Sequence, residues 1–346
     1  MDRNHRLLWA PAALLIAVLT IRTVFRQSEA LSARELLETL GGVSPLWFGI
    51  TILCMLGFIV WEGLSFYCIL RRLGHAQGLC RCLLYSSSDQ FFSAITPSAT
   101  GGQPASALFL RSHGISGAVV AFALLLNLIL YTASALLIGA FCLAVRPGVF
   151  LRLSTPSKLL IIFGMSALSG LCALFLTLLK NSDLFYRCGI RLLRFLHALH
   201  PVRKPELWEK KLAGTAAEYR SCAKTAAEHP GLLCGAFLCN LCQRFAQTGV
   251  TPALYCALGG AWSAKGIDLW VVQVLAQIGS YCVPVPGGMG AVDYLMLDGF
   301  RLLFQGDYVY ELQTLSRGIS FYLCTTLSGS VTLIGYAALR FRQRKR

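Results

Sequence analysis

Long apolar runs alternate with short polar segments along the chain, and most of the runs could cross a membrane as a single helix. A hydrocarbon layer of roughly 30 Å needs about 20 apolar residues at a helical rise of about 1.5 Å per residue. Runs of this length predict about six crossing helices. They cover residues 7–25, 45–70, 115–145, 157–180, 231–258 and 308–340.

A further apolar stretch, 85–111, has a centre that disfavours helix. Pro97 and Pro104 lack an amide hydrogen, and the adjacent Gly101 and Gly102 raise the cost of helix further. About a dozen apolar-leaning residues remain on each side, which is too few for a full crossing. The pattern predicts a re-entrant hairpin, in which one helix enters the membrane and a second leaves by the same face.

Residues 268–300 repeat this pattern. An apolar helix is interrupted there by Pro284, Pro286, Gly287, Gly288 and Gly290, and a second apolar helix follows. Either stretch alone could be an ordinary loop between two spans. Interrupted apolar segments at matching places in two halves of a chain are instead typical of a transporter's binding site.

These elements predict an all-α polytopic membrane protein with about six transmembrane helices plus two re-entrant hairpins, or six to eight crossings by hydropathy. The units 45–145 and 231–340 are each predicted to consist of a span, a hairpin and a second span, and the two units have opposite orientations. This is an inverted repeat, and we expect the two hairpin tips to meet near the middle of the membrane. Residues 1–346 then form a single integral membrane domain.

Three segments outside the repeat have predictions of their own. Residues 7–25 could be a cleavable signal peptide, since small residues follow near 28–30, but the length of the run favours an uncleaved span. Residues 29–40 have leucines at helical spacing and predict a short interfacial helix. The basic segment 181–230 is amphipathic, and we expect it on the cytoplasmic side along the lipid head groups.

Composition agrees with a membrane protein, because charged residues make up 14% of the chain against about 25% in soluble domains. The formal net charge is +15, but the basic residues gather at the ends of apolar runs, so anionic lipid is the expected partner rather than DNA. The predicted topology places 20 Lys and Arg residues on the side of the N-terminus and 6 on the other. We therefore expect a plasma-membrane protein with both termini in the cytoplasm.

Metal, cofactor and soluble-enzyme signatures are weak. Most of the 14 cysteines fall singly inside apolar runs, where they act as packing residues, and Cys80-x-Cys82 and Cys239-x-x-Cys242 lack a second pair. His197 and His200 have no carboxylate or cysteine beside them. No phosphate-binding glycine loop, nucleophile elbow or zincin motif occurs. We expect no metal and no cofactor.

A few ionisable residues lie inside the apolar runs, where each costs about 3 kcal/mol or more unless it faces protein or water. They are Glu62, Asp89, Arg244, Asp293, Asp298 and Arg317. A position near the head groups is favoured for Asp298 and stays open for Glu62.

The two arginines Arg244 and Arg317 beside the hairpins predict an anion site, since free amides at a helix N-terminus and a guanidinium both bind phosphate. Neutral donors would come from Ser98, Thr100 and Gln103. The carboxylates Glu62, Asp89 and Asp293 could hold a cationic group, balance the charge of the arginines or couple transport to a cation, and the sequence leaves these uses open.

At the two hairpins the sequence resembles the lysylphosphatidylglycerol synthetase/flippase transmembrane-domain family, which includes the membrane half of the multiple peptide resistance factor. The resemblance lies in Phe91-Phe92 leading into the run from Thr96 to Pro104, in the run from Pro284 to Gly290, and in Arg317 at the start of the last span. One departure is Asp293, where the family usually has Glu. The other is that we find no soluble aminoacyl-transferase domain after the membrane part.

The resemblance implies a lipid flippase-like protein that moves an anionic or aminoacylated phospholipid, such as lysyl-phosphatidylglycerol, between leaflets, with a link to antibiotic resistance. Polyprenyl-phosphate-linked lipids stay open as substrates. The alternatives are a phosphatidylglycerol lysyltransferase-type enzyme and a scaffold for a lipid or cell-wall enzyme, with a homo-oligomer or such an enzyme as partner. The expected head-group site comprises Pro97, Ser98, Thr100, Gly101, Gly102, Gln103, Arg244, Pro284, Pro286, Gly287, Gly288, Gly290 and Arg317.

Overall fold

The structure is a computed structural model that describes residues 42–96, 99–181, 191, 205–281, 283 and 285–344. Several predicted features therefore lie outside the described residues. These are the span 7–25, the interfacial helix 29–40, the residues Pro97, Ser98 and Pro284, and most of 181–204.

The described part of the chain is a bundle of helices, and four of its helical stretches are long and apolar enough to cross a membrane. They are Pro45–Arg72 (α3), Gly117–Val145 (α6), Thr155–Leu179 within α8 (Thr155–Lys180), and Tyr308–Phe341. The last of these contains α14 (Tyr308–Arg317), η4 (Gly318–Leu323) and α15 (Cys324–Arg344). All four match predicted spans, and the short helix α7 (Pro147–Arg152) between α6 and α8 was not predicted.

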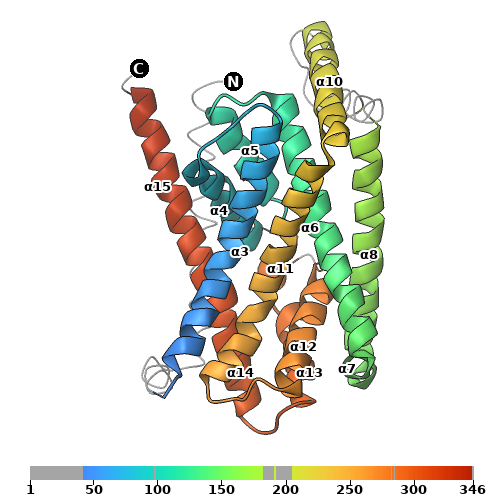
Figure 1. Cartoon of the computed structure of the whole chain (residues 1–346), viewed down its shortest axis with the longest axis vertical. Helices are drawn as coiled ribbons and strands as arrows, with labels where there is room; N and C mark the ends of the chain where they lie inside the picture. Colours follow the sequence, from blue (N-terminus) through green and yellow to red (C-terminus); the bar gives the residue numbers. More distant parts are fainter. Residues whose placement is uncertain are drawn as a thin grey trace.

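Helix α11 (Pro230–Ala257) also runs the length of the bundle and packs along α3 (Figure 1). It is less apolar because it carries Asn240, Gln243 and Arg244 on its buried face. Asn240 donates hydrogen bonds to Ser65 on α3 at 2.9 Å and to Asn127 on α6 at 3.2 Å. The buried polar side chains of α11 thus join it to its neighbours.

Both interrupted stretches form re-entrant hairpins, as predicted. Figure 1 shows the first hairpin in the half of the bundle that carries α10 and the C-terminus, and the second in the half that carries α7. The first consists of α4 (Leu79–Ile95) and α5 (Gly102–Ser112), and the second of α12 (Ala264–Ser280), η3 (Pro286–Gly288) and α13 (Ala291–Arg301). We call the two ends of the molecule the α10 end and the α7 end.

The two hairpins enter from opposite ends and meet, since α4 contacts η3. The order helix, hairpin, helix occurs first in α3 to α6 and again, in the reverse direction, in α11 to α15 (Figure 1). This is the predicted inverted repeat. The count of about six crossings stays a prediction, because the run 7–25 lies outside the described residues.

The second turn depends on glycine, since Gly287, Gly288 and Gly290 have φ values of 60°, 63° and 81°. Residues with a Cβ atom rarely adopt positive φ. In the first turn the positive φ falls on Ala99, at 55°. The three glycines of the second break therefore lie where the backbone leaves the helix, whereas Gly102 and Pro104 of the first break lie in the first turn of α5.

The two larger of the three hydrophobic clusters in the described residues lie in opposite halves of the bundle. Buried side chains such as Phe66, Tyr85 and Phe122 pack α3, α4 and α6 together toward the α10 end. Residues such as Met296 and Phe300 of α13 pack against α12 and its neighbours toward the α7 end. Each hairpin thus packs against an apolar cluster in its own half of the bundle.

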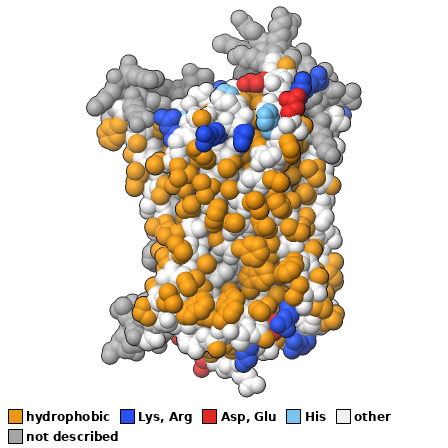
Figure 2. Space-filling view, viewed as in Figure 1, with side chains coloured by type: hydrophobic (Ala, Val, Ile, Leu, Met, Phe, Trp, Pro, Cys, Tyr) orange, Lys and Arg blue, Asp and Glu red, His pale blue; other side chains and the backbone are white. Residues whose placement is uncertain are grey.

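The face shown in Figure 2 is apolar around the middle, and its charged side chains, both basic and acidic, gather toward the two ends. Leucine, isoleucine and phenylalanine side chains such as Leu53, Ile162 and Phe163 are exposed at 69%, 53% and 60%. An apolar belt of this kind fits the hydrocarbon layer of a membrane.

Helix α10 (Pro205–Glu228) differs from the expected arrangement. We expected segment 181–230 along the head groups, but α10 extends along the long axis of the bundle (Figure 1). Tyr219 is fully buried and lies against Phe122, with ring centroids 5.4 Å apart. Apolar packing against α6 therefore outweighs interfacial placement for the C-terminal half of α10.

Candidate functional site

Polar side chains gather where the hairpin tips meet, in the middle of the bundle. Arg244 lies at the midpoint of α11 and Arg317 at the end of α14. Both are almost fully buried, with exposed fractions of 3% and 6%. They flank the second hairpin, because Arg244 contacts the end of α12 and Arg317 contacts the start of α13.

Arg244 is surrounded mainly by aromatic rings. Its Nη1 donates a hydrogen bond of 2.5 Å to the hydroxyl of Tyr281, the residue that ends α12. Its guanidinium carbon lies 3.7 Å from the ring centroid of Tyr131 on α6 and 5.5 Å from that of Phe58 on α3. Its Nε and Nη2 atoms are buried without a hydrogen-bond acceptor in the described chain. A buried guanidinium with two free donors is able to bind an anion.

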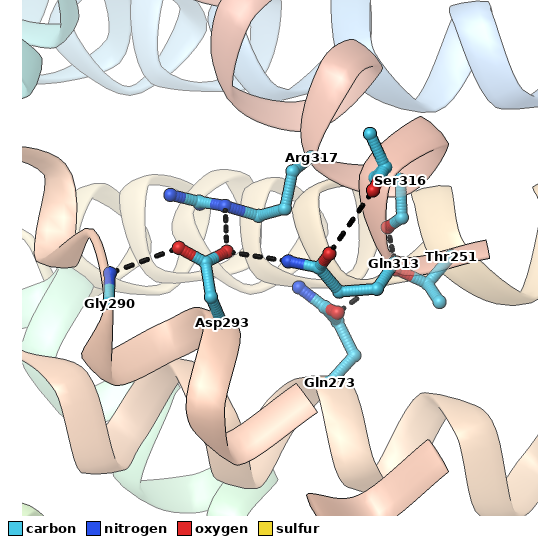
Figure 3. Close-up of polar contacts among 8 residues, drawn as sticks. Thr251, Gln273, Gly290, Asp293, Gln313, Ser316 and Arg317 are labelled. Atoms are coloured by element: carbon cyan, nitrogen blue, oxygen red, sulfur yellow. Dashed lines mark hydrogen bonds and ion pairs between the residues drawn. The ribbon is translucent and has the colours of Figure 1, made fainter. Parts of the chain in front are cut away.

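Arg317 has a carboxylate partner instead. Its Nε lies 3.0 Å from Oδ1 of Asp293 (Figure 3). Its guanidinium also lies over the ring of Phe321, 4.6 Å from the centroid. Gln313 donates a hydrogen bond of 2.8 Å to the same carboxylate oxygen. The charge of Arg317 is thus balanced within the chain, although its Nη2, like that of Arg244, is buried without a hydrogen-bond acceptor among the described residues. The two arginines differ in that Arg317 has a carboxylate partner.

A second polar cluster beside this pair connects three helices (Figure 3). Thr251 on α11 donates a hydrogen bond of 3.0 Å to Gln273 on α12 and shares a second one with Ser316 on α14. Residue Ser316 directly precedes Arg317, and η4, a π-helical turn, directly follows it. These bonds hold the arginine where the long helix changes its winding.

Glu62 on α3 lies on the other side of the tips. It is 4% exposed, and its Oε2 accepts hydrogen bonds from three neutral side chains. The donors are Gln90 of α4 at 2.8 Å, Gln243 of α11 at 3.2 Å and Ser86 of α4 at 3.2 Å. The sequence left open whether Glu62 is interfacial, and the structure places it inside the bundle.

Asp89 on α4 lies against the start of α5. Its Oδ2 accepts a hydrogen bond of 3.2 Å from Gln103, and its Oδ1 accepts one of 3.4 Å from Ser93. A Cβ atom on Gly102 would lie only 2.0 Å from Oδ1 of Asp89. Glycine is therefore required at this first position of α5.

Each hairpin's returning helix begins next to a carboxylate of the chain itself. Asp293 accepts a hydrogen bond of 3.0 Å from the backbone amide of Gly290 at the start of α13, while Asp89 packs on Gly102. The Gly101 amide donates to Thr96 at 2.8 Å. This differs from the predicted anion site, in which free hairpin amides face the ligand. The helix N-termini here stabilise internal side chains instead.

The other predicted site residues in the described chain surround these groups. Gly287 packs under Phe321, since a Cβ atom there would lie 2.3 Å from the ring. Pro286 and Gly288 form the η3 turn, and Thr100 lies in the first turn. Asp298 lies away from the tips, where it accepts a hydrogen bond of 2.9 Å from the Ser154 amide at the start of α8.

Tyr131, Tyr281 and Gln90 also belong to the site and were missed in the sequence. Tyr281 directly precedes the second break, and Gln90 follows Asp89, so polar side chains adjacent to the interrupted segments were the available signal. Nothing local marks Tyr131, which lies in the middle of α6. In the part of the chain that the structure describes, no cluster of three or more His, Cys, Asp or Glu residues could hold a metal ion.

Comparison with known proteins identifies the family to which the chain belongs. A search of curated proteins and a search of solved structures each returned no match. The family described as "Lysylphosphatidylglycerol synthase TM region" matches residues 9–328, which is nearly the whole chain and includes both hairpins and both buried arginines. With its apolar belt, its spanning helices and this match, the chain is a membrane protein that belongs to the lysylphosphatidylglycerol synthase transmembrane-region family.

Proposed function

We propose that this protein is a lipid flippase that passes the head group of an anionic or aminoacylated phospholipid through the space between the hairpin tips. The observation that carries the proposal is Arg244, which is buried at mid-bundle with two unpaired guanidinium nitrogens. Burial of an incompletely paired charge is costly. The buried guanidinium is stabilised when an anionic ligand supplies the hydrogen-bond acceptors that its free nitrogens lack.

The contrast between the two arginines supports Arg244 as the phosphate contact. Arg317 forms an ion pair with Asp293, whereas Arg244 has a hydroxyl and two aromatic rings as its nearest partners. A phosphodiester could accept hydrogen bonds from Nε and Nη2 of Arg244 without displacing a carboxylate. Arg317 would then position the second hairpin rather than bind the lipid.

The surroundings of Arg244 also suit the rest of a lipid. An apolar groove of about 510 Å³ lies on the lipid-facing side of α3, α11 and α12, and its walls include Trp47, Phe245, Trp262 and Trp270. Trp270 donates a hydrogen bond of 2.8 Å to Thr248, one turn from Arg244 on α11. Acyl chains could stay in this groove and in the surrounding lipid while the head group crosses.

The test is lipid exchange between leaflets in vesicles that contain the purified protein. Fluorescent phosphatidylglycerol and lysyl-phosphatidylglycerol should cross faster than in empty vesicles. Arg244→Gln should remove most of the acceleration and Arg244→Lys should retain part, because lysine keeps the charge but not the paired donors. The matched control is Arg146→Gln, at the α7 end in a pair with Asp268. Wild-type rates in the Arg244→Gln variant would refute the proposal.

A further inference from the structure

Two carboxyl groups that the lipid contact does not use lie side by side between the hairpin tip and α11. Glu62 on α3 accepts hydrogen bonds from Ser86 and Gln90, which flank Asp89 on α4, so the two carboxyl groups lie close together, and they are exposed by only 4% and 8%. A hydrogen bond between two carboxyl groups needs a proton, and two adjacent carboxylates in a buried site repel each other strongly. One proton shared by the pair satisfies both conditions.

The hydrogen-bond donors around the pair are neutral. Gln90, Gln243 and Ser86 donate to Glu62, and Gln103 and Ser93 donate to Asp89. These groups solvate one negative charge but bring no positive charge to cancel a second. The pair therefore holds one proton, and it loses this proton only when a cation lies close to it.

The groups that face the pair come from five helices besides α3. From α4 and α5 they are Ser86, Gln90, Ser93 and Gln103, and from α11 they are Gln243 and Arg244. From α15, Cys324 and Ser328 contact Gln90, and from α6, Tyr131 lies against the guanidinium of Arg244. Arg244 is the cation among these described groups, and its charge acts on Glu62.

The protonation of the carboxyl pair therefore depends on whether Arg244 has bound an anion. While Arg244 has no anion, its positive charge weakens the hold of the pair on its shared proton. When a phosphate binds to Arg244, that charge is neutralised, so the pair binds the proton more tightly and takes one up from water wherever it had been lost. Each ligand then favours the other by the same factor, because linkage is reciprocal.

We propose that the Glu62–Asp89 pair is a proton site and that one proton is taken up when an anionic lipid head group binds at Arg244. This inference rests on the proposed function and adds the coupling ion. The proton and the head group would move together, so that a proton gradient could drive lipid transfer. Gly102 transmits the change, because it packs directly on Asp89 at the start of α5.

The test measures proton uptake on lipid binding. Dioctanoyl-phosphatidylglycerol is titrated into the full chain in detergent, by calorimetry in two buffers of different ionisation enthalpy, between about pH 5 and pH 8. We expect net uptake of up to one proton per lipid, with affinity rising by up to about tenfold for each unit fall in pH. Inorganic phosphate and glycerol phosphate are titrated in parallel, to show whether the acyl chains are needed for the effect.

Variants separate the outcomes. Asp89→Asn, alone and together with Glu62→Gln, should still bind lipid but with no proton uptake and no dependence on pH in this range. Asp268→Asn, a carboxylate at the α7 end, should behave as the wild type. Lipid binding without proton uptake in the wild type would overturn this inference alone, and so would a requirement for Na⁺ in place of the pH effect. Failure to bind lipid at any pH would overturn the proposed function itself.

Discussion

Asp293 joins two helices at once: its Oδ1 lies 3.0 Å from Nε of Arg317 on α14, and its Oδ2 accepts the Gly290 amide at 3.0 Å. The carboxylate thus meets a positive side chain and the positive end of the α13 dipole together. Arg317 is buried, so its positive charge is balanced by the carboxylate of Asp293 rather than by solvent. Arg244, on the other side of the same hairpin, has no such partner.

Removing one member of the Asp293–Arg317 pair should destabilise the protein. Asp293→Asn leaves a buried guanidinium without its ion pair, and we expect a loss of about 3 kcal/mol, at the lower end of the range for buried pairs because the Asp293 side chain is 31% exposed. Unfolding in mixed detergent measures this loss. Arg146→Gln, which breaks a more exposed pair with Asp268, should cost less than about 1 kcal/mol. Equal losses in the two variants would contradict the assigned role of Asp293.

Gly102→Ala should disturb the first hairpin. The added Cβ atom would lie 2.0 Å from Oδ1 and 2.6 Å from the backbone oxygen of Asp89, and a backbone atom cannot move cheaply. We expect a loss of about 1–3 kcal/mol and slower lipid exchange. The control is Gly49→Ala, in helix α3 with nothing within 4 Å of the new atom, which should be neutral or slightly stabilising. A neutral Gly102→Ala would mean that the turn is looser than the structure shows.

Asp298 should make stability depend on acidity at the α7 end. Burial by itself raises the pKa of this carboxyl, but hydrogen bonds from Ser157 and Ser154 and the charge of Arg301 outweigh it, so the pKa falls below its ordinary value of 3.8. The stabilisation is therefore complete above the unfolded value and is lost as pH falls through the folded pKa. The thermal midpoint of Asp298→Asn should approach that of the wild type in acid and lie below it near neutrality. Asp307→Asn, an exposed carboxylate, serves as the control.

The α10 end should face the cytoplasm. Arg71 and Arg72 at the end of α3 and Arg111 at the end of α5 lie there, as the positive-inside rule requires. Cys80 is exposed at the same end, so a membrane-impermeant maleimide should label it only after cells are permeabilised. Labelling of Cys80 is measured as the difference in maleimide labelling between the wild type and the Cys80→Ser variant.

A cysteine at the α7 end is the matched control for that orientation. Lys265→Cys, in the first turn of α12, should react in intact cells. The reverse pattern of labelling would invert the proposed topology, and with it the direction in which protons and lipid would enter the site.

The positions of the helices and of their breaks could be predicted from the order of residues alone. The predicted spans agree with α3, α6, α8 and α11 to within a few residues, and the two helix breaks fall within the predicted stretches, between Ile95 and Gly102 and between Ser280 and Ala291. These are properties of the local chain: apolar length decides whether a helix spans a membrane, and proline and paired glycines disrupt the helix at their own positions. The inverted repeat followed from counting these elements in order.

The sequence also identified the charged residues of the site, because a charge within an apolar run is costly anywhere in a membrane. Only the tertiary structure decided what each charge does. Asp293 pairs with Arg317, Asp89 lies beside Glu62, and Arg244 is left with tyrosines. These contacts join helices that are distant in the sequence, and neither residue type nor local spacing distinguishes a paired arginine from a free one.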